Sequence, residues 1–206
     1  MMKLKYFALL ILSPLLPSAA FAHIGADAGI HHGSALDMGS IFLMGLVHPF
    51  TGLDHMGAML AVGMWSMLVF NKKQRSMWLL PVAFASVLLV GGALGLMSVE
   101  MPIVEPMLAV SLLMLGLLVA LRVRLPLIGG ALIVGTFAIF HGIAHGSEFP
   151  ADKAVAALSG MVLGTMLLQL SGMALARFVL QRNVWLPRIA GGVVAVLGAG
   201  LLSGAL

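Results

Sequence analysis

Six apolar stretches, each close to the length of a bilayer-crossing helix, occupy most of the chain from residue 53 onward. Crossing about 30 Å of hydrocarbon takes roughly 20 helical residues. Only 9% of the 206 residues are charged and 61% are hydrophobic, which is more apolar surface than one soluble core of this size can hide. We therefore expect an all-α, polytopic membrane helical bundle. Its six transmembrane helices are expected at about 53–70, 78–98, 104–121, 125–145, 154–176 and 186–206.

A seventh apolar run, residues 36–48, is too short for an ordinary span. Its thirteen residues predict a short re-entrant or interfacial helix that leads into the first full one. Prolines are expected in or near the first turns of the later helices, where a missing N–H costs little: Pro81, Pro106, Pro126 and Pro187. Glycines four residues apart predict close helix packing, at the pairs Gly91/Gly95, Gly142/Gly146, Gly160/Gly164 and Gly200/Gly204.

The first 22 residues have the pattern of a cleavable signal peptide. Lys3 and Lys5 precede a short apolar run that ends at Pro17, and the sequence Ala-Phe-Ala at 20–22 is typical of a cleavage site. We expect the mature chain to begin at His23, outside the cytoplasm. Residues 23–206 then form a single transmembrane domain.

Basic residues set the predicted orientation. They gather in three alternate loops: Lys72, Lys73 and Arg75 in the first, Arg122 and Arg124 in the second, and Arg177, Arg182 and Arg188 in the third. The positive-inside rule makes these loops cytoplasmic. We therefore expect an inner-membrane protein with six spans and both termini on the periplasmic side.

Acidic residues and histidines test this topology independently. All seven acidic residues and all seven histidines fall on the predicted outer side, and of the basic residues after the signal peptide only Lys153 joins them. An outer mouth rich in carboxylate and imidazole concentrates divalent cations. The basic residues are few and scattered, so we expect no nucleic-acid partner.

Two motifs gather candidate metal ligands. HPFTGLDH places His48, Asp54 and His55 at the break before the first span, and HGIAHGSE places His141, His145 and Glu148 at the outer end of the fourth. Residues four apart share one helix face, so His141 and His145 can hold one ion. With no cysteine in the chain, thiolate zinc sites and iron–sulfur clusters are excluded. Imidazole and carboxylate ligands suit nickel, cobalt or zinc.

Each group also has an ordinary structural interpretation. Thr51 and Asp54 match a capping box, and a single histidine near a membrane interface is usually a hydrogen-bonded core residue. Met56 and Met59, one turn from the first motif, are more typical of core packing than of thioether ligands. His23 offers a ring and, after cleavage, a free amine to the same ion, or else belongs to a solvated tail. Ionisable groups at membrane depth are costly, however, which favours a shared metal site.

At these motifs the sequence resembles the HupE/UreJ family of hydrogenase and urease accessory proteins, which are regarded as nickel permeases. The resemblance covers nearly the whole mature chain, including the signal peptide followed by a histidine. It implies that residues 23–206 form a metal-transport domain that supplies nickel, or cobalt in some relatives, for metalloenzyme maturation. It also implies functional roles for His48, Asp54, His55, His141, His145 and Glu148.

The sequence therefore predicts a permease for a divalent transition metal rather than an enzyme, with Ni²⁺ (or Co²⁺ or Zn²⁺) as the bound or transported ion and no prosthetic group. Its predicted partners are that ion and the lipid bilayer, and assembly into a homo-oligomer stays open. The chain has no P-loop for ATP hydrolysis. Two rivals remain: an intramembrane zinc-dependent hydrolase using an Asp and the His141/His145 pair, and a bis-histidine haem protein.

Overall fold

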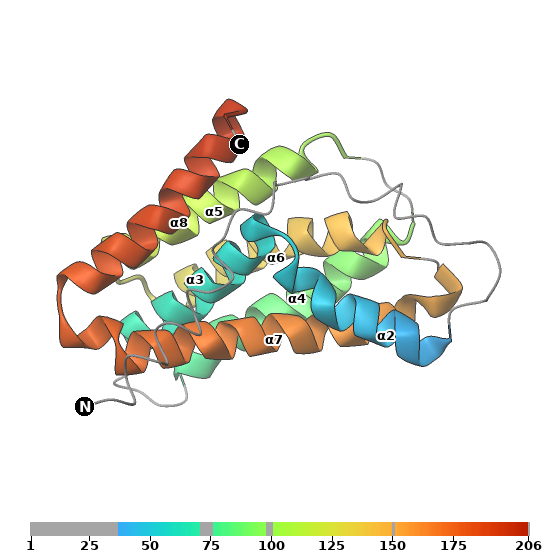
Figure 1. Cartoon of the computed structure of the whole chain (residues 1–206), viewed down its shortest axis with the longest axis horizontal. Coiled ribbons are helices and arrows are strands. Elements are labelled where there is room, and N and C mark those ends of the chain that lie inside the picture. Colours follow the sequence, from blue (N-terminus) through green and yellow to red (C-terminus); the bar gives the residue numbers. More distant parts are fainter. Residues whose placement is uncertain (1–36, 71–75, 98–100, 150, 206) are drawn as a thin grey trace. The chain divides into compact units, whose positions relative to one another are not determined.

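The computed structural model describes residues 37–70, 76–97, 101–149 and 151–205. The predicted signal peptide, its cleavage site and His23 lie outside these residues. Within them the fold is entirely helical (Figure 1). The α-helices are α2 (Met38–Val47), α3 (Leu53–Phe70), α4 (Leu79–Gly95), α5 (Val104–Ala120), α6 (Leu127–Gly146), α7 (Ala154–Phe178) and α8 (Trp185–Ser203), joined in part by short 3-10 turns.

These helices correspond closely to the apolar stretches of the sequence. Four of them, α3, α6, α7 and α8, are long and apolar enough to cross a membrane. The apolar helices α4 and α5 have 17 residues each, which is about 26 Å of helix and the lower end of the usual range for a span. Pro81, Pro106 and Pro187 lie in the first turns of their helices and Pro126 is the N-cap of α6, as expected.

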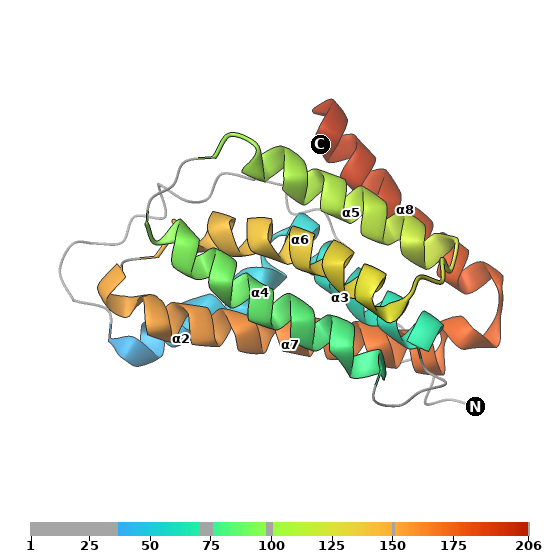
Figure 2. The same cartoon turned by 180° about the vertical axis from the view of Figure 1, so that it is seen from behind.

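Glycines bring α4 and α6 into backbone contact along their C-terminal halves (Figure 2). A Cβ placed on Gly91 would meet the backbone of Ile139 and Gly142, and one on Gly95 would meet Ile143 and Gly146. The contacting residue numbers increase together along both helices, so α4 and α6 run in the same direction. The predicted role of these two glycine pairs in close packing is confirmed.

The helices α5 and α8 pack in the opposite sense. Gly116 lies against Ala195, and Gly198, further along α8, lies against Leu113, earlier in α5. This antiparallel register agrees with a chain that alternates direction from helix to helix. Gly204, by contrast, corrects a prediction. A Cβ placed on Gly204 would meet no atom of a neighbouring helix among the described residues, and Gly204 caps α8 with φ of 68°, so glycine is needed there for its backbone conformation and not for packing.

A helix interrupted in the middle runs along α7. The short helix α2 packs on the first half of α7, where Phe42 lies against Gly160 and Leu46 against Gly164. The chain then passes through the 3-10 turn η2 (His48–Phe50) into α3, which packs further along α7 (Figure 1). A short helix is therefore present within the apolar run at residues 36–48, and the turn after it leaves Phe50 and Thr51 exposed between two helical segments.

Apart from Asp54, at the start of α3, the charged residues in the described part of the chain separate to the two ends of the bundle. The acidic end, as we call it, is where α4 and α6 finish and α5 and α7 begin. It carries Glu105, Glu148, Asp152 and Lys153, with Asp37 capping α2. At the opposite end, the arginine end, lie Arg122, Arg124, Arg177, Arg182 and Arg188. The charge pattern predicted from the loops is therefore realised in the fold.

Candidate metal centre

The break between α2 and α3 supplies the first set of candidate ligands. His48 begins the 3-10 turn, and Thr51 closes it by donating both its backbone N–H (3.0 Å) and its hydroxyl (2.7 Å) to the His48 carbonyl. In a capping box the Thr51 N–H would bond to the Asp54 carboxylate. Here that N–H is bonded to His48 instead, so the alternative interpretation of Thr51 and Asp54 as a capping box is not supported. Asp54 instead lies 2.7 Å from the Nδ1 atom of its neighbour His55.

The second set lies on the last turns of α6. His141 and His145 are one turn apart and both are fully buried. Gly142 and Gly146, which alternate with them, pack against the backbone of α4. Because those glycines hold α6 tightly to α4, the histidine face of α6 is fixed in orientation toward the interior. Glu148 follows directly after the helix and its Oε1 atom lies 3.8 Å from His145 Nδ1.

These two sets converge. The ring centroids of His55 and His145 are 4.4 Å apart, those of His48 and His145 4.5 Å, and those of His55 and His141 5.4 Å. All four imidazoles therefore form one cluster, with Asp54 and Glu148 attached to it. The sequence predicted that the two motifs meet, and the structure brings all six described residues together.

Hydrogen bonds fix which nitrogen two of these rings present to the cluster. His141 Nδ1 lies 3.0 Å from the Phe137 carbonyl, which only accepts, so Nδ1 carries the proton. His55 Nδ1 is paired with the Asp54 carboxylate in the same way. In both rings Nε2 is left with a free lone pair, and among the described residues neither Nε2 atom has a hydrogen-bond partner. Metal-binding histidines typically have this arrangement, with the second nitrogen held by a carboxylate or carbonyl.

His145 is the most unusual member of the cluster. Both of its ring nitrogens are buried, and neither finds a hydrogen-bond partner within the described residues. A buried polar atom without a partner costs about 1–3 kcal/mol, so such atoms are rare in folded proteins and call for an explanation. A cation held by the cluster would explain the unpartnered nitrogen that binds it.

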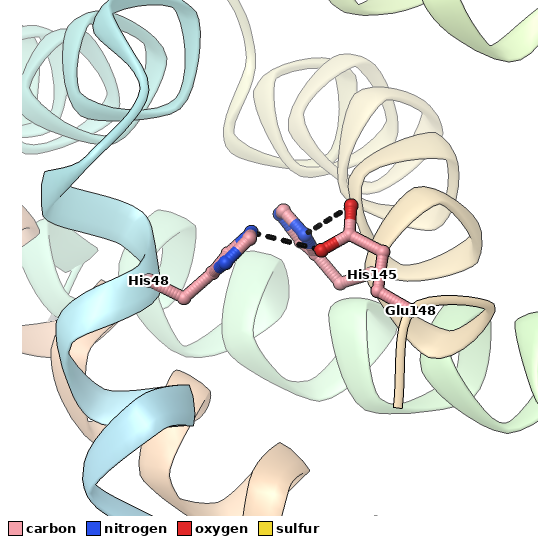
Figure 3. A group of neighbouring side chains, drawn as sticks. All are labelled: His48, His145 and Glu148. Atoms are coloured by element: carbon pink, nitrogen blue, oxygen red, sulfur yellow. Dashed lines mark ion pairs between the residues drawn. The ribbon is translucent and has the colours of Figure 1, made fainter. Parts of the chain in front are cut away.

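Three ligand atoms lie close enough for a single ion (Figure 3). One atom each from His48, His145 and Glu148 falls within 4.8 Å of the others. Figure 3 shows the His48 ring reaching from the turn after α2 toward His145 and Glu148 at the end of α6. His48 Nε2 is 3.3 Å from Glu148 Oε2.

Burial increases steadily across the cluster. The exposed fraction of the side chain falls from 43% for Glu148 to 29% for Asp54 and 27% for His48, and then to 13% for His55 and 1% for His145. Glu148, Asp54 and His48 therefore form the accessible side of the cluster, and His55, His141 and His145 its interior. Partial burial also raises the pKa of the Glu148 carboxyl, while the nearby His55 acts in the opposite direction.

Comparison with known proteins agrees with the motifs that build this cluster. The sequence pattern of the HupE / UreJ protein family matches residues 9–201. The chain belongs to the HupE/UreJ family. A relative described as Protein HupE, from Rhizobium leguminosarum bv. viciae, is 42% identical over 192 residues, covering 92% of this chain and 93% of that protein. No solved structure matches the chain.

Membership in the HupE/UreJ family confirms the resemblance seen in the two motifs. The matched region contains all six clustered residues. His23 also falls within it but lies outside the described residues, so its role as a ligand stays a prediction. Met59 is fully buried and Met56 packs against the main hydrophobic core, in line with their ordinary interpretation.

Sequence reasoning missed the aromatic rings that border the cluster. Phe84 of α4 packs against His141, with ring centroids 5.6 Å apart, and Phe149 packs against His48 at 6.0 Å. Neither ring carries a sequence signal, because phenylalanines are common in apolar helices. Two buried polar residues of α7, Thr165 and Gln169, were also missed. The spacing of a threonine and a glutamine one turn apart within an apolar span could have predicted a buried polar pair.

Proposed function

We propose that the protein is an inner-membrane permease that imports a divalent transition metal, with nickel as its physiological ion, for the maturation of a hydrogenase or urease. One observation carries this proposal: four imidazoles and two carboxylates from separate membrane segments meet in one cluster. Membership in the HupE/UreJ family supports the same role.

In this proposal α3 to α8 each cross the bilayer, and α2 enters it from the periplasmic side without crossing. The acidic end faces the periplasm and the arginine end the cytoplasm, as the positive-inside rule requires. Both ends of the mature chain then lie in the periplasm. Support comes from the parallel register of α4 with α6 and the antiparallel register of α5 with α8, which fit helices that alternate in direction.

The donor set favours a borderline metal ion. Imidazole nitrogens with carboxylate oxygens suit Ni²⁺, Co²⁺ and Zn²⁺, whereas magnesium and calcium prefer oxygen alone and copper(I) prefers sulfur. Glu148 and His48, on the accessible side of the cluster, capture the hydrated ion. The buried nitrogens of His55, His141 and His145 then replace part of its water shell.

The membrane potential supplies a driving force for import. Moving a doubly charged ion into an inside-negative cell is favoured by about 4.6 kcal/mol per 100 mV, twice the value for a single charge. The ion must also leave the cluster, so the binding has to be reversible at cellular metal concentrations. No second function is favoured by a specific observation.

Uptake of radioactive nickel by cells producing the protein tests the proposal. We expect His48→Ala and His141→Ala each to abolish most uptake, because each removes a ligand from a different arm of the cluster. Thr136→Val is the matched control, since the Thr136 side chain is exposed and its hydroxyl donates within its own helix, to the Leu132 carbonyl. Unchanged uptake in both histidine variants would refute the proposal. Competition by cobalt and zinc in the same assay identifies the preferred ion.

A further inference from the structure

Two polar side chains lie buried in the bundle beyond the histidine cluster. Thr165 and Gln169 of α7 have no exposed surface. Within the described chain, neither the Thr165 hydroxyl nor either polar atom of the Gln169 amide has a hydrogen-bond partner. Threonine and glutamine at i and i+4 share one helix face, so these atoms form one polar patch inside an otherwise apolar region.

The other buried hydroxyls provide a contrast. Ser66 donates to the Met77 carbonyl, and Ser111 donates to the Leu108 carbonyl at 2.6 Å. Threonine could likewise donate to the carbonyl one turn back in its own helix, as Thr136 does. The lack of any such bond at Thr165, together with the two unsatisfied atoms of Gln169, indicates that these groups serve a partner other than the protein.

Packing places this patch on the side of the cluster that faces the arginine end. Gly164, next to Thr165, lies against Leu46 and Pro49, beside His48. Gln169 is one turn further along α7, and its backbone lies against Gly63. Gly63 is itself two turns past His55 in α3, about 12 Å of helix. The patch therefore begins at the level of the histidine cluster and extends from it toward the arginine end.

No histidine or acidic residue in the described part of the chain lies between the cluster and the arginine end. Each of them lies either in the cluster or at the acidic end. An ion that leaves the cluster toward the arginine end meets buried, unpartnered oxygen atoms only at Thr165 and Gln169, within the described residues. Neutral oxygens bind a divalent cation more weakly than imidazole does in this metal series, which suits a site that the ion must leave quickly.

We propose that Thr165 and Gln169 form an inner transit site for the transported divalent cation. There the hydroxyl and the amide oxygen hold the partly hydrated ion after it leaves the histidines. This proposal rests on the proposed function of the protein. It assigns to α7 the inner half of the path, for which the sequence offered no ligand.

Two measurements on the same variants test the transit site: the initial rate of radioactive nickel uptake into proteoliposomes, and equilibrium nickel binding to the purified full-length protein. Thr165→Val and Gln169→Leu keep the size of each side chain and remove its polar atoms. We expect uptake to fall about ten- to hundredfold, comparable to the loss of one hydrogen bond to a charged group. Nickel affinity should stay within about twofold of the wild-type value, because the histidine cluster is intact.

Matched variants separate a polar role from a packing role. Thr165→Ser keeps the hydroxyl and should retain most uptake, while Thr136→Val, the lipid-facing counterpart, should behave as the wild type. Wild-type uptake in both Thr165→Val and Gln169→Leu would overturn the transit site and leave the proposed function standing. Equal losses in Thr165→Val and Thr165→Ser, or loss of nickel binding together with uptake, would overturn it in favour of a structural role. A wild-type protein that moves no nickel would instead refute the proposed function, and the transit site with it.

Discussion

Replacing Asp54 by asparagine exchanges one carboxylate oxygen for an NH₂ group and removes the negative charge. This substitution tests whether Asp54 binds the metal directly or instead orients the His55 ring, which binds it. The Asp54 carboxylate lies 2.7 Å from His55 Nδ1 and holds the proton there, so that Nε2 faces the cluster. An asparagine oxygen can still accept from Nδ1, and therefore the geometry should survive. What is lost is the charge on the acceptor.

The expected size of the effect follows from that loss. Hydrogen bonds to charged groups contribute about 1.5–3 kcal/mol and neutral ones about 0.5–1.5 kcal/mol. The difference, about 1–1.5 kcal/mol, corresponds to roughly a tenfold weaker nickel affinity in Asp54→Asn. His55→Ala removes the ring itself and should weaken binding further. Isothermal titration of the purified protein with nickel measures both.

Asp152→Asn is the matched control for charge. Asp152 is an exposed carboxylate at the acidic end, in the 3-10 turn before α7, and it lies outside the cluster. Its replacement removes the same charge and should leave the affinity nearly unchanged. If Asp54→Asn bound nickel as tightly as the wild type, the orienting role would be wrong. If it were as weak as His55→Ala, Asp54 would be a direct ligand instead.

Three further predictions follow from the packing and the electrostatics. Gly142→Ala should destabilise the protein by about 1–3 kcal/mol in a denaturant titration, because the added methyl group meets the backbone of Leu88 and Gly92. Gly129→Ala, on the same helix, is the control: the methyl group has room there, so this change should be neutral or stabilising. Trp65→Phe removes the 2.9 Å hydrogen bond from the indole N–H to the Val123 carbonyl and should cost about 0.5–1.5 kcal/mol in the same assay; an unchanged midpoint would count against that bond. Burial raises the pKa of the Glu148 carboxyl, so this carboxylate takes up a proton at a higher pH than a surface glutamate does. Nickel affinity should therefore fall as the pH is lowered through that pKa, and Glu148→Gln should flatten this part of the pH profile.

Much of the fold could be predicted from local sequence signals. Prolines marked where the helices begin, because an imino nitrogen is tolerated only in the first turn. The glycines of α4 and α6 marked a close contact, because only small residues let helix backbones meet in lipid. The i, i+4 spacing of His141 and His145 placed both rings on one face.

Other features depend on which face of a helix points inward, and the sequence does not encode that clearly here. Lipid and protein interior are similarly apolar, so hydrophobic periodicity cannot separate a buried Thr165 from an exposed Thr136. The pairing of Asp54 with His55 was also not predicted, because the two residues are adjacent rather than at helical spacing. For Gly204, the spacing to Gly200 suggested packing, but the position at the helix end decides its role.

The candidate ligands are divided between two closely packed pairs of helical segments. His141 and His145 belong to α6, with Glu148 just after it, and α6 is joined to α4 through backbone contacts. His48 and His55 belong to the interrupted helix, which is joined to α7 in the same way. Between these pairs, at Gly92, the contact is a flexible Leu158 side chain instead. An ion bound by ligands from both helix pairs would therefore bridge them. Metal binding would draw the two helix pairs together, and metal release would require them to separate.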